Sequence, residues 1–64
     1  MNIQSALTEG LNILKNKSIL SAKLDSEILM AKALGKKREY IILNNDNIIK
    51  EQNLKYFKKL VHER

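Results

Sequence analysis

A chain of 64 residues has room for one small domain. The absence of cysteine excludes disulfides and thiolate metal sites, and a single histidine leaves almost no scope for a zinc site made of protein ligands alone. The net charge of +5 is compatible with binding of nucleic acid or an acidic partner, although a composition rich in Lys, Asn and Ile is also what an AT-rich genome produces whatever the function.

The first predicted helix starts at Asn2, which can cap it, and runs to about Lys15. Its apolar residues recur at steps of three or four, which places them on one helical face: Ile3, Leu7, Leu11 and Leu14, widened by Ala6 and Ile13. Gly10 lies next to this face, where it costs up to about 1 kcal/mol relative to alanine. We therefore expect another helix to approach closely at Gly10. The segment Asn16-Lys17-Ser18 predicts the end of the helix.

The second predicted helix follows Ser21, a candidate N-cap, and ends at Gly35, which can adopt the left-handed conformation that terminates helices. Asp25 and Glu27 lie in its early turns, where the helix dipole favours acidic side chains. The predicted core-facing stripe consists of Leu24, Ile28, Ala31 and Leu34, broadened by Leu29 and Met30. On this interpretation, replacing Leu24 or Ile28 by alanine would cost about 2–4 kcal/mol.

A third, short element is predicted over Glu39–Leu43, a run rich in strand-forming residues. Because a lone strand has no partner in so short a chain, we expect a helix of about two turns that places Tyr40 and either Leu43 or Ile41 on the core. Asn44-Asn45-Asp46-Asn47 predicts a loop, since asparagine and aspartate bond their own backbone.

The last predicted helix runs from about Lys50 to the end of the chain. Its predicted buried residues are Leu54, Phe57, Leu60 and Val61, and Lys55, Lys58, Lys59 and Glu63 are expected to face water. No residue terminates this helix, which suggests a piece of a longer protein; a natural terminus that frays is the alternative. Without proline and with two glycines, the whole chain predicts an all-α fold, a small orthogonal or up-down bundle of four to five short helices.

Motifs for catalysis are absent from the sequence. There is no glycine-rich phosphate loop and no pair of histidines at helical spacing. Asp25 and Glu27 lie two positions apart on a helix and so point apart, and His62 is expected on the surface. We therefore expect no catalytic, cofactor-binding or metal-binding residue. The longest apolar runs are too short to span a bilayer and the N-terminus lacks the pattern of a secretory signal, which favours a cytoplasmic protein.

The segment Leu24–Gly35, with the sequence LDSEILMAKALG, resembles a characteristic helix of the N-terminal domain of the HemK/PrmC family. These methyltransferases modify the glutamine of the GGQ motif in class I release factors. An amphipathic first helix, Arg38 before an apolar patch, a polar loop and a last helix with a basic end complete the resemblance. Ser26 replaces a usual alanine, and Ile49 stands where the family tends to place a Ser or Thr cap, so Asn47 is expected to cap the last helix.

The resemblance implies that residues 1–64 form a helical N-terminal substrate-recognition domain that helps grip a class I peptide chain release factor. In the family, a following catalytic methyltransferase domain binds S-adenosylmethionine and holds the target glutamine. The cofactor glycines and the Asn-Pro-Pro-Tyr motif belong to that domain and do not occur here. No catalytic residue can be carried over, and this fragment is not expected to bind the cofactor, although the parent protein is expected to be a protein-glutamine methyltransferase.

The best candidates for partner binding are Lys36, Lys37 and Arg38, the densest positive cluster of the chain. We expect them to contact an acidic partner or ribosomal RNA; the alternative is a solvated cluster after a helix C-terminus, where the dipole favours positive charge. Two other functions are a small basic nucleic-acid-binding module and a protein-interaction bundle with no enzyme attached. The nucleic-acid hypothesis is weakened because no helix displays a readout face of Arg, Asn and Gln.

Overall fold

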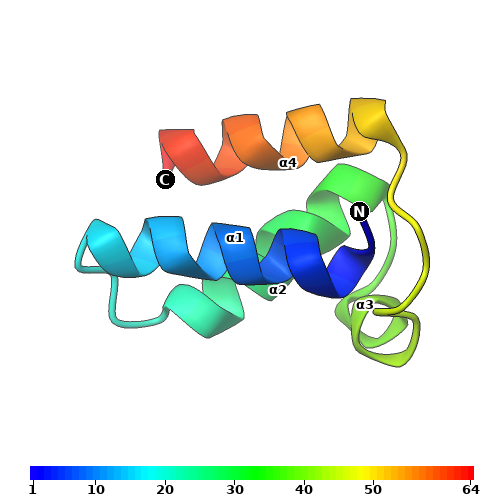
Figure 1. Ribbon diagram of the computed structural model, residues 1–64. Coiled ribbons are helices and arrows are strands. Elements are labelled where there is room, and N and C mark those ends of the chain that lie inside the picture. Colours follow the sequence, from blue (N-terminus) through cyan, green and yellow to red (C-terminus); the bar gives the residue numbers. More distant parts are fainter.

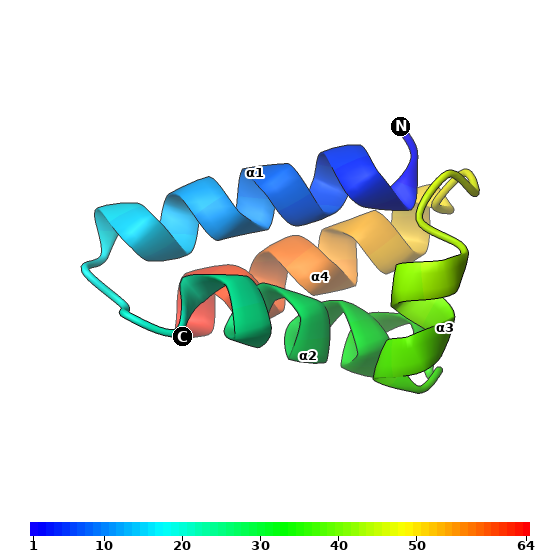
Figure 2. The same cartoon turned by 90° about the horizontal axis from the view of Figure 1, so that it is seen from below.

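The computed structural model describes all 64 residues and contains four α-helices: α1 (Ile3–Asn16), α2 (Ala22–Leu34), α3 (Arg38–Leu43) and α4 (Glu51–Glu63). In Figures 1 and 2, α1 and α4 run side by side in the same direction, α2 runs the opposite way, and α3 lies across the end of the bundle where α2 finishes. This arrangement confirms the predicted small all-α bundle. It also confirms a short helix, not a strand, over Glu39–Leu43.

Two of the helices end in the same hydrogen-bonded turn. After α1, Ser18 adopts a left-handed conformation with φ 61°, and the N–H of Ile19 donates to the carbonyl of Leu14 at 3.1 Å. After α2, Gly35 adopts φ 65°, and the N–H of Lys36 donates to the carbonyl of Ala31 at 3.0 Å. These bonds satisfy carbonyls that have no partner inside the helix. The prediction for Gly35 is confirmed, and at the end of α1 a serine takes the same role.

The helix starts agree with the sequence only in part. The side chain of Asn2 accepts a hydrogen bond from the N–H of Ser5 at 2.8 Å, which confirms the predicted cap of α1. Ser21 makes no such bond, and the N-cap residue of α4 is Lys50, which has no capping side chain. The prediction that Asn47 caps α4 is therefore wrong.

Asn47 instead belongs to a loop that is hydrogen-bonded to the beginning of α1. Its carbonyl accepts the N–H of Ile3 at 2.9 Å, and the carbonyl of Asn45 accepts the N–H of Gln4 at 2.8 Å. The N–H of Ile49 donates to the carbonyl of Met1 at 3.1 Å. Because the first N–H groups of a helix have no partner within it, this loop stabilises the start of α1 and holds residues 45–49 in place.

The buried core receives residues from every helix and from the loop before α4: Ile3, Ala6, Leu14, Ala22, Met30, Ala33, Ile41, Ile49, Phe57 and Val61. For α1 and α4 the predicted stripes are confirmed, since their remaining members are packed against this core. Of the two alternatives for α3, the core residue is Ile41, whereas the side chain of Leu43 is 80% exposed.

The predicted core face of α2 is wrong for Leu24 and Ile28, whereas Met30 is buried and Leu29, Ala31 and Leu34 pack against the core. Leu24 and Ile28 are 43% and 48% exposed, and the residues that α2 buries include Ala22, Ser26 and Ala33. Because α2 packs against all three other helices, small side chains are needed where the helix axes approach closely. Apolar residues occur on both its inner and outer faces, so hydrophobic periodicity could not distinguish the two.

Candidate protein-binding surface

The three cations predicted to bind a partner lie together at the turn from α2 to α3, but they have different neighbours. Arg38 Nε lies 2.9 Å from Glu27 Oε1, and this ion pair joins α3 to α2. Lys36 Nζ lies 5.2 Å from the centroid of the Tyr40 ring, within the range of a cation–π interaction. The side chain of Lys37 is exposed and makes no ion pair. The cluster is therefore one cation that links two helices and two that remain exposed to solvent.

Several other basic side chains connect parts of the fold. Lys17 Nζ donates to the carbonyls of Val61 and His62, at 3.1 and 2.6 Å. These carbonyls lie in the last turn of α4, where positive charge is favoured by the dipole. Lysines of α4 also form ion pairs with glutamates, at 3.9 Å for Lys58 with Glu9 and 3.7 Å for Lys55 with Glu51. Part of the net positive charge is thus used within the domain.

The Asp25-Ser26-Glu27 segment contacts each of the other helices in turn. Asp25 Oδ2 accepts from Nε and Nη2 of Arg64, the residue after α4, each at 3.0 Å. Ser26 is buried and its hydroxyl donates to the carbonyl of Leu7 on α1 at 3.0 Å. Glu27 Oε1 accepts a hydrogen bond from Nε of Arg38, the first residue of α3. The two carboxylates point apart, as predicted, and their observed role is to fix the packing of α2.

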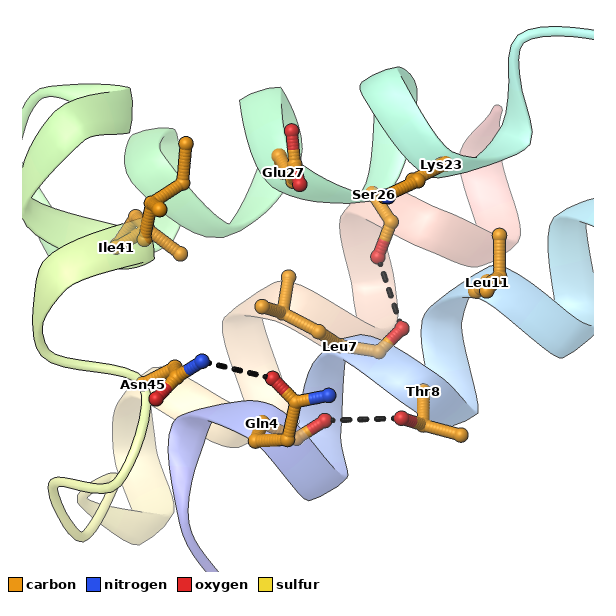
Figure 3. Close-up of a pocket in the computed structure, with 10 residues that line it drawn as sticks. Gln4, Leu7, Thr8, Leu11, Lys23, Ser26, Glu27, Ile41 and Asn45 are labelled. Atoms are coloured by element: carbon orange, nitrogen blue, oxygen red, sulfur yellow. Dashed lines mark hydrogen bonds between the residues drawn. The ribbon is translucent and has the colours of Figure 1, made fainter.

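A groove of about 270 Å³ runs between α1, α2 and α3, and Figure 3 shows its lining. Leu7 and Leu11 contribute apolar surface from α1, and Ile41 contributes it from α3. Much of its polar rim is bonded internally, as in the 3.0 Å contact of Asn45 Nδ2 with Gln4 Oε1. No group of three or more His, Cys, Asp or Glu side chains that could hold a metal ion is present, and His62 is exposed on α4.

An exposed apolar row, which we call the α2 stripe, consists of Leu20 in the turn before α2 and of Leu24 and Ile28 on the outer face of α2. Their exposed fractions are 104%, 43% and 48%. Leu24 and Ile28 are spaced four apart and so lie on one side of the helix, and Leu20 precedes it. A helix that is apolar on both its inner and outer sides is typical of one buried between two partners. No helix is both long enough and apolar enough to cross a membrane.

The chain is a small all-α bundle that exposes an apolar stripe and cations without carboxylate partners. More specifically, the chain belongs to the PrmC N-terminal domain family, whose model matches residues 5–64. This confirms the family resemblance found in Leu24–Gly35.

The chain is also similar to the release factor glutamine methyltransferase of Clostridium botulinum (strain Hall), with 41% identity over 58 residues. The alignment covers 89% of this chain and 20% of that relative, so the chain spans about one fifth of the relative's length. The comparison with solved structures gives no match.

Proposed function

We propose that residues 1–64 are the substrate-recognition domain of a release factor glutamine methyltransferase. The domain would bind a class I peptide chain release factor in the cytoplasm and present it to a methyltransferase domain that uses S-adenosylmethionine. Membership of the PrmC N-terminal domain family and the named relative support this proposal. The modification would act on translation termination, through the glutamine of the GGQ motif.

The observation that carries release factor binding is the pair of exposed, unpaired cations at the turn from α2 to α3. Lys36 and Lys37 have no carboxylate partner, whereas Arg38 is engaged with Glu27. Exposed charges at the rim of an interface increase the association rate and make it sensitive to salt. Lys36 and Lys37 would thus contact an acidic region of the release factor, and Arg38 would orient them by fixing the start of α3.

Calorimetric titration of the 64-residue chain with a purified class I release factor tests this function. We expect saturable binding that weakens as salt rises, and a K36E/K37E variant that binds at least about fivefold more weakly. Arg38 stays unchanged, because a glutamate there would face Glu27. The control variant K15E/K59E changes the net charge equally at two exposed lysines elsewhere. An absence of heat with the release factor, together with tight binding of a ribosomal RNA fragment, would replace this function by nucleic-acid binding.

The α2 stripe is proposed to contact the methyltransferase domain itself. About four fifths of the relative lies outside the matched segment, so a full-length enzyme has a second part that can cover the stripe. Burying the exposed portions of Leu24 and Ile28 against that part would stabilise the joined domains by the usual hydrophobic contribution, about 25 cal/mol per Å² of apolar surface removed from water.

The exposure of the α2 stripe leads to a prediction in two contexts. In the isolated chain, Leu24→Ala or Ile28→Ala should cost about 1 kcal/mol or less in the free energy of unfolding, because about half of each side chain already contacts water. Urea unfolding followed by circular dichroism measures this cost, with the buried Met30→Ala as the matched control that loses several times as much. In a full-length enzyme, L24E/I28E should separate the thermal unfolding of the two domains. A single transition unchanged from wild type would show that the stripe is not covered there.

A further inference from the structure

A hollow of about 320 Å³ lies at the end of the bundle that carries α3, between the end of α2, α3 and the segment before α4. The residues that line it and matter here are Lys36, Tyr40, Asn47, Ile48, Lys50 and Asn53. They come from regions up to 17 positions apart in the chain. The hydrogen bonds between residues 45–49 and the start of α1 hold one side of this hollow, and the turn after α2 holds the other.

The charged side chains that line the hollow are all positive. Lys36 and Lys50 line it, neither forms an ion pair, and no aspartate or glutamate is among its lining residues. In contrast, Arg38 and Arg64 are each bound to a carboxylate on α2. Two lysines that share a concave site and lack carboxylate partners attract a negatively charged ligand and raise its local concentration.

The remaining lining residues provide contacts of other kinds. Ile48 is 77% exposed, although the adjacent Ile49 is 6% exposed and belongs to the core. The side-chain amides of Asn47 and Asn53 make no hydrogen bond within the domain, so both can donate to and accept from a bound backbone. A ligand that matches all these groups carries carboxylates, an apolar side chain and peptide groups.

We propose that this hollow binds an acidic segment of the release factor in which carboxylate side chains alternate with apolar ones. The proposal rests on the proposed function, and it adds Lys50, Asn53 and Ile48 to a contact region that the sequence had placed only at residues 36–38. Nucleic acid fits the hollow less well. Its only aromatic ring, that of Tyr40, is already paired with Lys36 and is not free to stack on a base, and two cations do not form a path along a phosphate backbone.

The test uses the ¹⁵N-labelled 64-residue chain and three probes: a class I release factor, a synthetic peptide of alternating glutamate and leucine, and an oligouridylate. The variant K36E/K50E is compared with K15E/K59E, which has the same net charge and alters lysines that do not line the hollow. We expect the peptide to shift the amide signals of Ile48, Lys50 and Asn53. We expect K36E/K50E to weaken binding of both peptide and release factor about tenfold or more, and the control to change it less than about threefold.

The outcomes separate this inference from the proposed function. Release factor binding that K36E/K50E leaves unchanged would overturn the hollow as the site while the proposed function stands. Peptide binding in the hollow without any release factor binding would retain the site's chemistry and overturn the proposed function. Equal losses in K36E/K50E and the control would show a non-specific charge effect, and stronger binding of the oligouridylate at the same residues would show a nucleic-acid site. Either result overturns the inference.

Discussion

Phe57→Ala is expected to unfold most of the isolated domain at 37 °C. The Phe57 side chain is 1% exposed and is the largest fully buried side chain of the chain. Removing a buried phenylalanine costs about 3–5 kcal/mol, because the lost burial is combined with a cavity that the surroundings fill only in part. A core of this size rarely supplies more than about 3–5 kcal/mol in total. The expected loss is therefore nearly as large as the free energy of unfolding of the whole domain.

Circular dichroism at 222 nm with urea titration measures this effect, and the loss of dispersed amide signals would identify the unfolded population. Tyr56→Ala is the matched control, because Tyr56 is the adjacent aromatic residue of α4 and is 41% exposed. The control should retain a cooperative transition with a modest loss. A Phe57→Ala protein that melts within a few degrees of wild type would show that α4 does not depend on this contact.

The sequence predicted the two outer helices well because each has one apolar face. On α1 and α4, large apolar residues and charged residues lie on opposite sides, so spacing alone identified Leu14, Phe57 and Val61 as core. On α2 the same reasoning chose Leu24 and Ile28 along with Met30. Met30 is buried, but the other residues that this helix buries are small: Ala22, Ser26 and Ala33. Where a central helix is packed tightly, side-chain size as well as hydrophobicity decides which residues are buried.

The binding surface was predicted only where it is local in sequence. Lys36 and Lys37 are adjacent and follow a helix end, so they could be recognised as a cluster. Their relation to Lys50 depends on the loop before α4, which folds back onto the start of α1 through backbone hydrogen bonds. Because backbone bonds of this kind depend little on side-chain identity, no sequence signal reveals that Lys50 lies beside the same hollow as Lys36.

The family motif itself has a structural explanation. Within it, Asp25, Ser26 and Glu27 point in three directions and contact the end of α4, α1 and the start of α3 respectively. Gly35 closes α2 in the left-handed conformation and so sets the direction in which the chain enters α3. The motif therefore determines how four helices are assembled, and the groups proposed for release factor binding lie outside it.

Gly10→Ala is expected to destabilise the domain by about 1–3 kcal/mol, although alanine is the better helix former by about 1 kcal/mol. A Cβ atom at Gly10 would lie 2.5 Å from Cζ and 2.9 Å from Cε2 of Phe57, and 3.1 Å from Ser26 Oγ. The ring cannot move aside without disturbing the core, because it is itself buried. The close helix approach predicted from Gly10 is thus confirmed, and the glycine is required by the aromatic ring of α4.

Two companion variants identify the cause of the Gly10→Ala effect. Gly35→Ala tests a glycine with no atom within 4 Å of the added Cβ, so its expected loss of about 1 kcal/mol comes from the positive φ alone. The double variant Gly10→Ala with Phe57→Leu removes the ring atoms that meet the new methyl group. If the steric explanation is correct, urea unfolding should show that this double variant loses at least about 1 kcal/mol less than the sum of the two single losses. Losses that add within about 0.5 kcal/mol would show that the ring is not what requires glycine at position 10, and the cost would then have to arise from the contact with Ser26 on α2.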